Sequence, residues 1–442
     1  MRCFSFRFWE FLPAFSSFPA YFFSNFGRGF PRRDCIPRKT KEKSPTHHFR
    51  GVSPLKSGNS ILAGYGTTIF ETMSRLARQH GAINLGQGFP EGLEPDALLR
   101  EAARLMNEGP QQYAPMLGLP ELRHAVARHA RRFYGLEADA DTEVMVTSGA
   151  TEALAACLFG LIEPGDEVVV LEPCYDSYLP ILRRAGAVPR LVRLPPPDWS
   201  LPRQALAEAF GPRTKLMILN SPMNPTGKVF DAAELAVIAD LLQRHDAYCL
   251  CDEVYEHQIY DEARHIPLIT LPGLRERCLR VGSAGKSFSV TGWKVGYVTA
   301  APALLAMAAR AHQYLTFATP PALQGAVAAG LDWDDGYFQG LRRDLQDRRD
   351  HLRAGLEAAG LAVLPCRGSY FLTADIRPLG FDDDEAFCRH ITEKAGVAAV
   401  PLSAFYPGGG TRHLARFCFA KTQDILDVAA LRLRQHFRET SS

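Results

Sequence analysis

Strand-like and helix-like segments alternate along the sequence from about residue 140 onward. The helical stretches include residues 151–161, 231–245 and 302–313. The short apolar runs cover residues 143–147, 167–171, 188–194, 215–219, 247–251, 278–282 and 295–299. Near-continuous apolar strands separated by helices are typical of a parallel sheet that is covered on both faces. The sequence therefore predicts an α/β fold with a mainly parallel seven-stranded sheet between helices.

The chain has 442 residues, which is enough for two domains. Residues 335–442 mix helical stretches with short strands, which predicts a second, smaller α+β domain. Upstream of the sheet, residues 67–80 have apolar side chains on one helical face, a threonine at the start and Gly81 after the end, which predicts a helix.

Composition excludes several classes of protein. A formal charge of +2 is too small for a dedicated nucleic-acid binder. The ten cysteines are scattered without zinc-ligand spacing, so we expect no metal site. Cys249 and Cys251 lie in an apolar strand-like run, so we expect buried thiols rather than ligands and a reducing compartment, the cytosol.

Residues 1–57 differ from the rest, being rich in Phe, Pro and basic side chains. A targeting peptide is basic and poor in acids, but Pro and Phe at this density disrupt an amphipathic helix. A membrane anchor is disfavoured, because its best window, residues 8–26, contains Glu10, prolines and serines. We expect a disordered N-terminal extension, or a start assigned too early in a chain that begins near Val52.

A lysine lies at the centre of the segment SAGKSFSVTGWKVGY, residues 283–297. Lys286 follows an apolar strand and is surrounded by small residues. A lysine that is desolvated or close to another cation loses its proton easily, so Lys286 is a candidate Schiff-base nucleophile. Lys294 and hydroxyls such as that of Ser283 could hold a phosphate beside it. Alone, such a lysine is more often a surface residue in a Gly/Ser loop.

Polar residues follow several strands of the predicted sheet, at the edge where such sheets bind ligands. The turn at Gly149 opens a helix whose N–H groups suit a phosphate, although a simple capped turn has the same composition. Tyr175 could stack on a flat ring or belong to the core. Asn224 lies in a rigid Asn–Pro turn and could donate a hydrogen bond to a ring oxygen. Asp252 ends an apolar strand and needs a cationic partner, such as a pyridinium nitrogen.

The motifs SGATEAL, SPMNPTG, CDEVYE and SAGKSFSVTGWKVGY occur together in this order. In this respect the chain resembles the class I/II aminotransferases of pyridoxal phosphate (PLP) fold type I, from about residue 67 to the end. The segments GTTIFETMSRLARQH, INLGQGFP, QQYAPM and HQYLTF resemble the kynurenine/glutamine transaminase branch, and within it the bacterial methionine aminotransferases. The resemblance implies a PLP-dependent transaminase that exchanges an L-amino acid and a 2-oxo acid in a ping-pong cycle.

The resemblance also implies a role for each site residue. Lys286 forms the Schiff base and is the catalytic residue. The cofactor-binding residues are Gly149, Ala150, Thr151, Tyr175, Asn224, Asp252, Tyr255, Ser283, Lys286, Lys294 and, from the second subunit of a homodimer, Tyr113. The substrate-binding residues are Gly88, Asn224, Phe70 and Arg416, the last as the clamp for the α-carboxylate. Lys294 takes a place where many relatives have arginine, and lysine is common there in this branch.

On this basis we expect residues 98–334 to form a large PLP-binding domain. Residues 58–97 and 335–442 would then form the small domain. Tyr65, Phe70 and Phe317 are candidate walls of a pocket that favours methionine, aromatic or kynurenine-type side chains over aspartate. No nucleic-acid or membrane partner is expected.

Two alternatives remain open. A cysteine-S-conjugate β-lyase uses the same cofactor and begins with the same loss of the Cα proton, so the residues named here do not separate the two activities. A transcription regulator with an aminotransferase-like domain is disfavoured, because residues 1–57 lack helix-turn-helix patterning.

Overall fold

A computed structural model describes residues 56–439 of the chain. The expectation for residues 1–57 therefore lies almost entirely outside the described residues. The helices are α1 (Ile69–His80), α2 (Asp96–Glu108), α3 (Pro120–Tyr134), α4 (Gly149–Leu161), α5 (Tyr178–Ala185), α6 (Arg203–Ala209), α7 (Ala232–Arg244), α8 (Ala284–Ser287), α9 (Pro302–Leu315), α10 (Pro321–Leu331), α11 (Asp335–Ala358), α12 (Asp384–His390) and α13 (Gln423–Glu439). None of the helices within these residues is long and apolar enough to cross a membrane.

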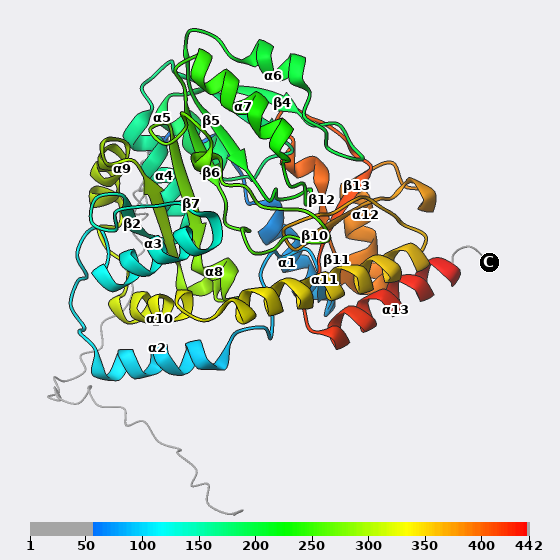
Figure 1. Cartoon of the computed structure of the whole chain (residues 1–442). Helices are drawn as coiled ribbons and strands as arrows, with labels where there is room; N and C mark the ends of the chain where they lie inside the picture. The colour runs from blue at the N-terminus through cyan, green and yellow to red at the C-terminus, as the bar shows by residue number, and fades with distance from the viewer. Residues whose placement is uncertain (1–55, 440–442) are drawn as a thin grey trace, which may run out of the picture. The chain divides into compact units, whose positions relative to one another are not determined.

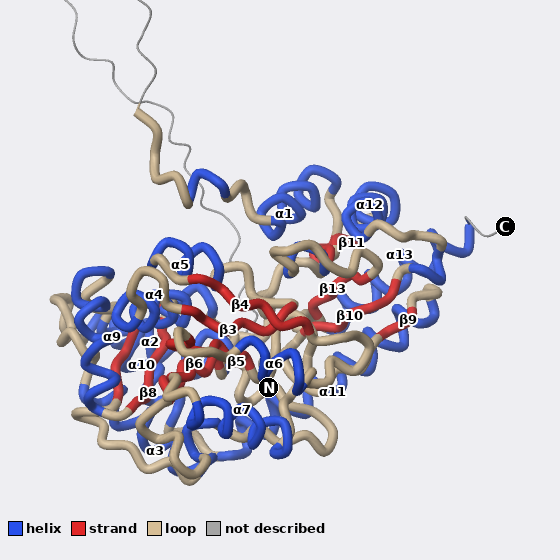
Figure 2. Tube along the Cα trace, turned by 90° about the horizontal axis from the view of Figure 1, so that it is seen from above, coloured by secondary structure: helices blue, strands red, loops and turns tan. Residues whose placement is uncertain are grey.

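Thirteen strands form three sheets within the described residues. The strands are β1 (Ile83–Asn84), β2 (Val144–Ser148), β3 (Glu167–Glu172), β4 (Val188–Arg193), β5 (Thr214–Asn220), β6 (Tyr248–Asp252), β7 (Cys278–Ser283), β8 (Val295–Ala300), β9 (Ala362–Val363), β10 (Phe371–Asp375), β11 (Val397–Ala398), β12 (Val400–Pro401) and β13 (Leu414–Cys418). Figure 2 shows the strands of the large sheet as one group and β9, β10, β11 and β13 as another.

The large sheet has seven strands in the order β2-β8-β7-β6-β5-β3-β4. The neighbours from β7 to β4 are parallel, whereas β8 runs antiparallel to both β2 and β7. Each of the seven apolar runs in the sequence corresponds to one of these strands. The predicted α/β fold with a mainly parallel seven-stranded sheet is confirmed.

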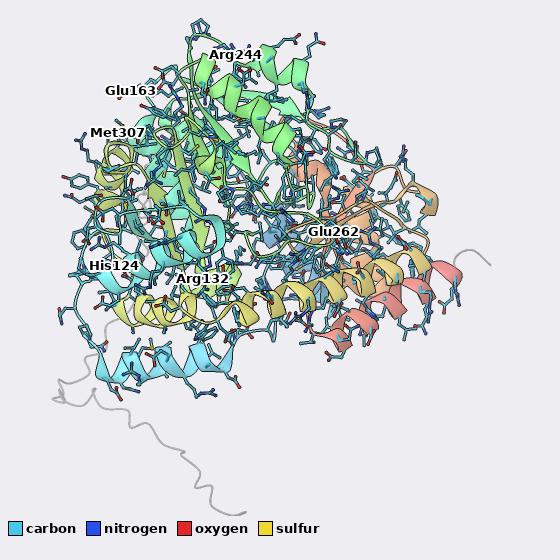
Figure 3. All side chains as sticks on the ribbon, in the orientation of Figure 1. His124, Arg132, Glu163, Arg244, Glu262 and Met307 are labelled. Carbon is cyan, nitrogen blue, oxygen red and sulfur yellow. The ribbon has the colours of Figure 1, made fainter. Side chains whose placement is uncertain are left out.

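Helices cover both faces of the central strands of the sheet, and successive side chains along a strand point alternately into one or the other of two cores. Val168 and Val170 of β3 pack in one core cluster with side chains of α4, α5 and α9. Val169 and Leu171 belong to a second cluster that α7 covers from the other side. Met307 of α9 and Arg244 of α7, labelled in Figure 3, lie on these two opposite sides. β3 therefore has a continuous apolar centre, whereas the edge strand β4 is mostly exposed and carries two arginines.

Residues 362–418 contribute most of the two smaller sheets. Four of their strands form an antiparallel sheet in the order β12-β13-β10-β9. β11 pairs in parallel with β1, so that Ile83 lies opposite Val397. The long helix α11 extends past α8 to pack along α13 (Figure 1). The pairing of β1 with β11 brings the turn after β1 beside the ends of β10 and β13.

Candidate active site

A cavity of about 430 Å³ opens at the carboxyl ends of the parallel strands. Its walls come from segments far apart in the sequence: the turn after β1, the start of α4, the ends of β5, β6 and β7, and strands β10 and β13. The predicted site residues that line it are Phe70, Gly88, Gly149, Ala150, Thr151, Tyr175, Asn224, Asp252, Tyr255, Ser283, Lys286, Lys294 and Arg416.

Tyr113, Tyr65 and Phe317 do not line this cavity. Tyr113 is 87% exposed, and its ring packs edge-on against Phe317 at 5.9 Å between centroids. Tyr65 lies at the surface, where its hydroxyl accepts a hydrogen bond of 2.8 Å from Arg183. Within one chain, these three side chains are therefore separate from the other candidate residues.

Lys286 lies in the short helix α8, directly after β7. Its amine donates a hydrogen bond of 2.8 Å to the Tyr370 hydroxyl. Burial lowers the pKa of Lys286 to about 8, because a charged amine is poorly solvated there. An amine that loses its proton near neutral pH can attack a carbonyl carbon.

Asp252 ends β6 and is buried. Burial raises the pKa of its carboxyl, while the hydrogen bond of 2.6 Å from the Tyr178 hydroxyl acts in the opposite direction. In the described chain no arginine, lysine or histidine forms an ion pair with Asp252. A buried carboxylate that lines a cavity without a cationic partner suits a ligand with a protonated nitrogen.

The start of α4 has the features of an anion site. Ser148 precedes the helix and its side chain does not cap the first N–H groups. Gly149 has a φ of +75°, and a Cβ atom there would lie 3.3 Å from the Lys294 Nζ. Gly296 of β8 lies close to the Gly149 backbone: a Cβ atom added to Gly296 would be 2.6 Å from the Gly149 carbonyl carbon. Uncapped N–H groups, the helix dipole and a lysine amine together can hold a phosphate.

Arg416 in β13 is buried at the opposite side of the cavity. It donates hydrogen bonds of 2.8 Å to the Asn224 Oδ1 atom and 2.7 Å to the Gly86 carbonyl. Its Nε atom is buried without a partner, and in the described chain no carboxylate forms an ion pair with it. Its guanidinium lies 3.9 Å from the Phe371 ring centroid, and burial lowers its pKa to about 10. A buried guanidinium with a free N–H group suits a carboxylate ligand.

Asn224 is held in place by a neighbouring amide. Its backbone N–H donates a hydrogen bond of 2.8 Å to the Asn220 Oδ1 atom. Asn220 in turn donates to the Asp252 carbonyl at 2.9 Å, so the turn after β5 is fixed to the end of β6. Tyr255 follows β6, and its buried ring lies edge-on to Tyr370 at 5.1 Å.

Sequence reasoning missed several residues of the cavity and its support. Tyr178 is the hydroxyl donor to Asp252, and Tyr370 is the acceptor for Lys286. Tyr178 lies only three residues after Tyr175, so the second tyrosine of CYDSY was an available signal. Tyr370 had no local signal, because it reaches Lys286 from a segment 84 residues away.

Within residues 56–439, one group of side chains has the composition of a metal site: His129, Glu256 and His257. Its hydrogen-bonding groups are already paired. The two histidine Nε2 atoms lie 2.8 Å apart, and Glu256 binds Arg280 and the Tyr297 hydroxyl. Burial lowers the pKa of His129 to about 3 and of His257 to about 4, so both rings are neutral at pH 7. The cluster belongs to the core behind β6.

The cavity residues fit a cofactor with an aldehyde, a phosphate and a pyridine nitrogen. Lys286 offers an amine of lowered pKa, and Asp252 offers a buried carboxylate without a cation. The start of α4, with Lys294 close to Gly149, offers an anion site. The Arg416 guanidinium lines the cavity and has no ion-pair partner in the described chain, so it suits a second anionic group, such as a substrate carboxylate.

Comparison with known proteins gives the same assignment. The family model for aminotransferase class I and II matches residues 80–433. A probable N-succinyldiaminopimelate aminotransferase of Mycobacterium tuberculosis is 46% identical over 85% of this chain and 97% of its own length. The methionine aminotransferase of Escherichia coli is 41% identical over 85% of this chain and 97% of its own length. Kynurenine–oxoglutarate transaminase 1 of Rattus norvegicus is 35% identical over 85% of this chain and 96% of its own length.

Solved structures agree. The structure of N-succinyldiaminopimelate aminotransferase from Mycobacterium tuberculosis superimposes with a TM-score of 0.84, and this match covers 86% of our chain and all of that one. The methionine aminotransferase structure from Escherichia coli also has a TM-score of 0.84, with 86% of our chain covered and all of that one. The chain therefore belongs to the class I and II aminotransferases, and it is an enzyme that uses pyridoxal phosphate to transfer an amino group between an amino acid and a 2-oxo acid.

Proposed function

We propose that the enzyme transaminates L-amino acids with methionine, aromatic or kynurenine-type side chains. The observation that supports this preference is the chemistry of the cavity wall. Phe70, Phe89 and Phe371 line the cavity, and the rings of Phe70 and Phe371 lie 5.1 and 3.9 Å from the Arg416 guanidinium. The cations among the lining residues are Lys286, Lys294 and Arg416, and each has a role in holding cofactor or substrate. No further cation within the described lining is available for a second substrate carboxylate.

Bound pyridoxal phosphate supplies an aldehyde that takes up the substrate amino group and a ring that accepts electrons when Cα loses its proton. Lys286 holds the cofactor through its amine until substrate arrives. Once released, the same amine moves the proton from the substrate Cα, since a pKa near 8 allows it both to accept and to return a proton. Lys286 is thus the proposed catalytic residue.

Other residues hold the cofactor in place. Asp252 keeps the ring nitrogen protonated, and a buried position strengthens that charge pair. Asn224 and Tyr255 would hydrogen-bond the ring oxygen, and Tyr175 would stack on the ring. The backbone of Gly149, Ala150 and Thr151, with Ser283 and Lys294, holds the phosphate.

Arg416 binds the α-carboxylate of the substrate, and the backbone of Gly88 contacts the same group. Asn224 links the two sites, because its side chain accepts a hydrogen bond from Arg416. An Nε atom without a partner in the free protein is satisfied when a carboxylate binds.

We propose a homodimer in which Tyr113 reaches the phosphate of the other subunit. The support is that Tyr113 is 87% exposed and lies outside the cavity of its own chain. We also propose a large domain of residues 98–334 and a small domain of residues 58–97 and 335–442, which the pairing of β1 with β11 supports. A cytoplasmic location is in keeping with free cysteines that are all buried among the described residues.

Steady-state kinetics with several amino donors test the substrate proposal. With one 2-oxo acid acceptor, kcat/KM is measured for methionine, phenylalanine, kynurenine, aspartate and N-succinyl-diaminopimelate. We expect the first three to exceed the last two by at least about 100-fold, because a buried carboxylate without a partner costs about 3 kcal/mol or more. Equal kcat/KM for methionine and aspartate, or a preference for the succinylated donor, contradicts the proposal.

A further inference from the structure

The Tyr370 hydroxyl lies between the Lys286 amine and the turn after β1. It accepts a hydrogen bond of 2.8 Å from the amine, and it donates one of 2.8 Å to the Gly88 carbonyl. The direction of both bonds follows from their chemistry. A carbonyl can only accept, so the single phenolic proton points to Gly88 and the oxygen is left to accept from Lys286.

Tyr370 has little freedom to adopt another position. Its side chain is fully buried, and its ring packs against Tyr255 and Phe371 with centroids 5.1 and 4.8 Å away. It directly precedes β10, which pairs along its whole length with β13, the strand that carries Arg416. Within residues 56–439, the bond to Tyr370 is the only hydrogen bond of the Lys286 amine.

The turn that Tyr370 contacts is bound to the same part of the fold at further points. The Gly86 carbonyl accepts from Arg416, and the Glu91 carboxylate accepts from Lys421 at 2.8 Å. Lysine, turn and arginine are therefore joined through side chains of residues 370–421. One hydroxyl, that of Tyr370, connects the turn directly to the Lys286 amine.

We propose that Tyr370 is a positioning residue of the transamination reaction, which holds the Lys286 amine and couples it to the turn at Gly88. This inference rests on the proposed role of Lys286 and of Gly88 at the substrate carboxylate. Tyr370 acts through Lys286 rather than on the substrate. Its hydroxyl fixes where the amine lies before the cofactor or substrate is engaged.

The bond also affects the protonation of the amine. Burial lowers the pKa of Lys286 most, and the nearby cations Arg416 and Lys294 lower it further, whereas Cys418 and Asp252 raise it. A neutral hydroxyl that accepts from the amine stabilises the charged form. Loss of the hydroxyl therefore lowers the pKa of Lys286 further.

The test compares Tyr370→Phe with Tyr260→Phe in the full chain freed of cofactor. Tyr260 is a matched control, because it is also fully buried and its hydroxyl donates to the Ser369 carbonyl, next to Tyr370, without contact to the amine. The pKa of Lys286 is measured by competitive acetylation over a range of pH, with mass spectrometry of the peptide that contains it. We expect the pKa to fall by about 1 in Tyr370→Phe and to stay unchanged in Tyr260→Phe. An unchanged or higher pKa in Tyr370→Phe overturns the proposal.

Kinetics of the cofactor-loaded variants give the second readout. A misplaced amine slows proton transfer, so we expect kcat of Tyr370→Phe to fall about 10-fold or more, with KM within about 3-fold of wild type. A kcat of Tyr370→Phe equal to that of the wild type overturns the positioning role of Tyr370. If the wild-type enzyme transaminates none of the tested amino acids, the proposed substrates are wrong, while the acetylation experiment still decides whether Tyr370 controls Lys286.

A fluorinated tyrosine at position 370 provides a test if Tyr370→Phe does not fold. Fluorine withdraws electrons from the hydroxyl, which makes the oxygen a weaker acceptor while the ring and the bond to Gly88 are retained. The pKa of Lys286 should fall in the same direction by a smaller amount. An unchanged pKa in this protein also overturns the proposal.

Discussion

Lys286 has a lower proton affinity than a lysine in water, because the pocket around it solvates a charge poorly. Burial lowers its pKa to about 8. The same desolvation acts on Asp252 and Arg416. It raises the pKa of the Asp252 carboxyl, and it lowers the pKa of the Arg416 guanidinium to about 10. The free enzyme thus keeps three poorly solvated ionisable groups around one cavity, and under the proposed function each would gain a partner when cofactor or substrate binds. This is a cost in folding stability that ligand binding offsets.

The cost at Lys286 predicts a pH dependence of stability in the cofactor-free chain. The unfolded chain keeps the lysine proton up to about pH 10.4. The folded chain releases that proton near pH 8, so folding becomes more favourable as the pH rises between these values. Lys286→Met removes the buried charge, and we expect it to stabilise the chain by about 2 kcal/mol at pH 7, a value reduced because the amine is partly accessible from the cavity.

Denaturant unfolding of both proteins at pH 7 and pH 10 measures this difference. Most of the advantage of Lys286→Met should be lost at pH 10, because the folded wild-type chain no longer carries the buried charge. An equal free energy of unfolding for the two proteins at pH 7 would show that the buried amine has no such cost.

The sequence predicted side chains better than it predicted their supporting contacts. Lys286, Asp252 and Asn224 follow strands within recognisable motifs, and all three line the cavity. Tyr370 and Tyr178 are as important for the geometry, because their hydroxyls bind Lys286 and Asp252. Such contacts depend on how distant segments pack, and no spacing along the chain specifies them.

At the scale of elements, long apolar runs were predicted well and short paired segments were not. β5 has seven residues and β7 has six, and both agree with the predicted runs within one residue at each end. β1, β11 and β12 have two residues each and were missed. Two residues show no periodicity, and their pairing is a consequence of the tertiary fold rather than of local propensity.

The pairing of β6 with β7 is reinforced by a buried ion pair that can be tested. Arg280 of β7 donates to Glu253 at 2.6 Å and also binds Glu256, all three nearly inaccessible. Arg280→Gln leaves two buried carboxylates without their cation, so we expect a loss of about 3–5 kcal/mol in the free energy of unfolding.

Arg377→Gln is the control for that variant. Arg377 forms an ion pair with Asp375 at the surface, where its side chain is 61% exposed. Such pairs contribute less than about 1 kcal/mol. If Arg280→Gln and Arg377→Gln lose the same free energy of unfolding, measured by heat or denaturant, the structural role of Arg280 is contradicted.

At the scale of the whole molecule, the cavity of one chain contains every predicted cofactor-binding residue except Tyr113. The proposed dimer predicts that two defective variants complement each other. Lys286→Ala and Tyr113→Ala are co-expressed with different affinity tags, and the mixed dimer is isolated. One of its two sites then combines the intact lysine of one subunit with the intact Tyr113 of the other, so about half of the wild-type activity per dimer should return. A mixed dimer no more active than Tyr113→Ala would show that the tyrosine serves only its own chain, or no site at all.

The central claim is that a cavity built around Lys286 transfers the amino group of an amino acid such as methionine. A single half-reaction tests it most directly: the cofactor-loaded enzyme is mixed with L-methionine without any oxo acid, and 2-oxo-4-methylthiobutanoate is measured by mass spectrometry. We predict about one equivalent of product per chain from the wild type and from the control Lys394→Ala, an exposed lysine, and none from Lys286→Ala. Equal product from Lys286→Ala, or no oxo acid from methionine, phenylalanine or kynurenine with the wild type, would contradict the claim.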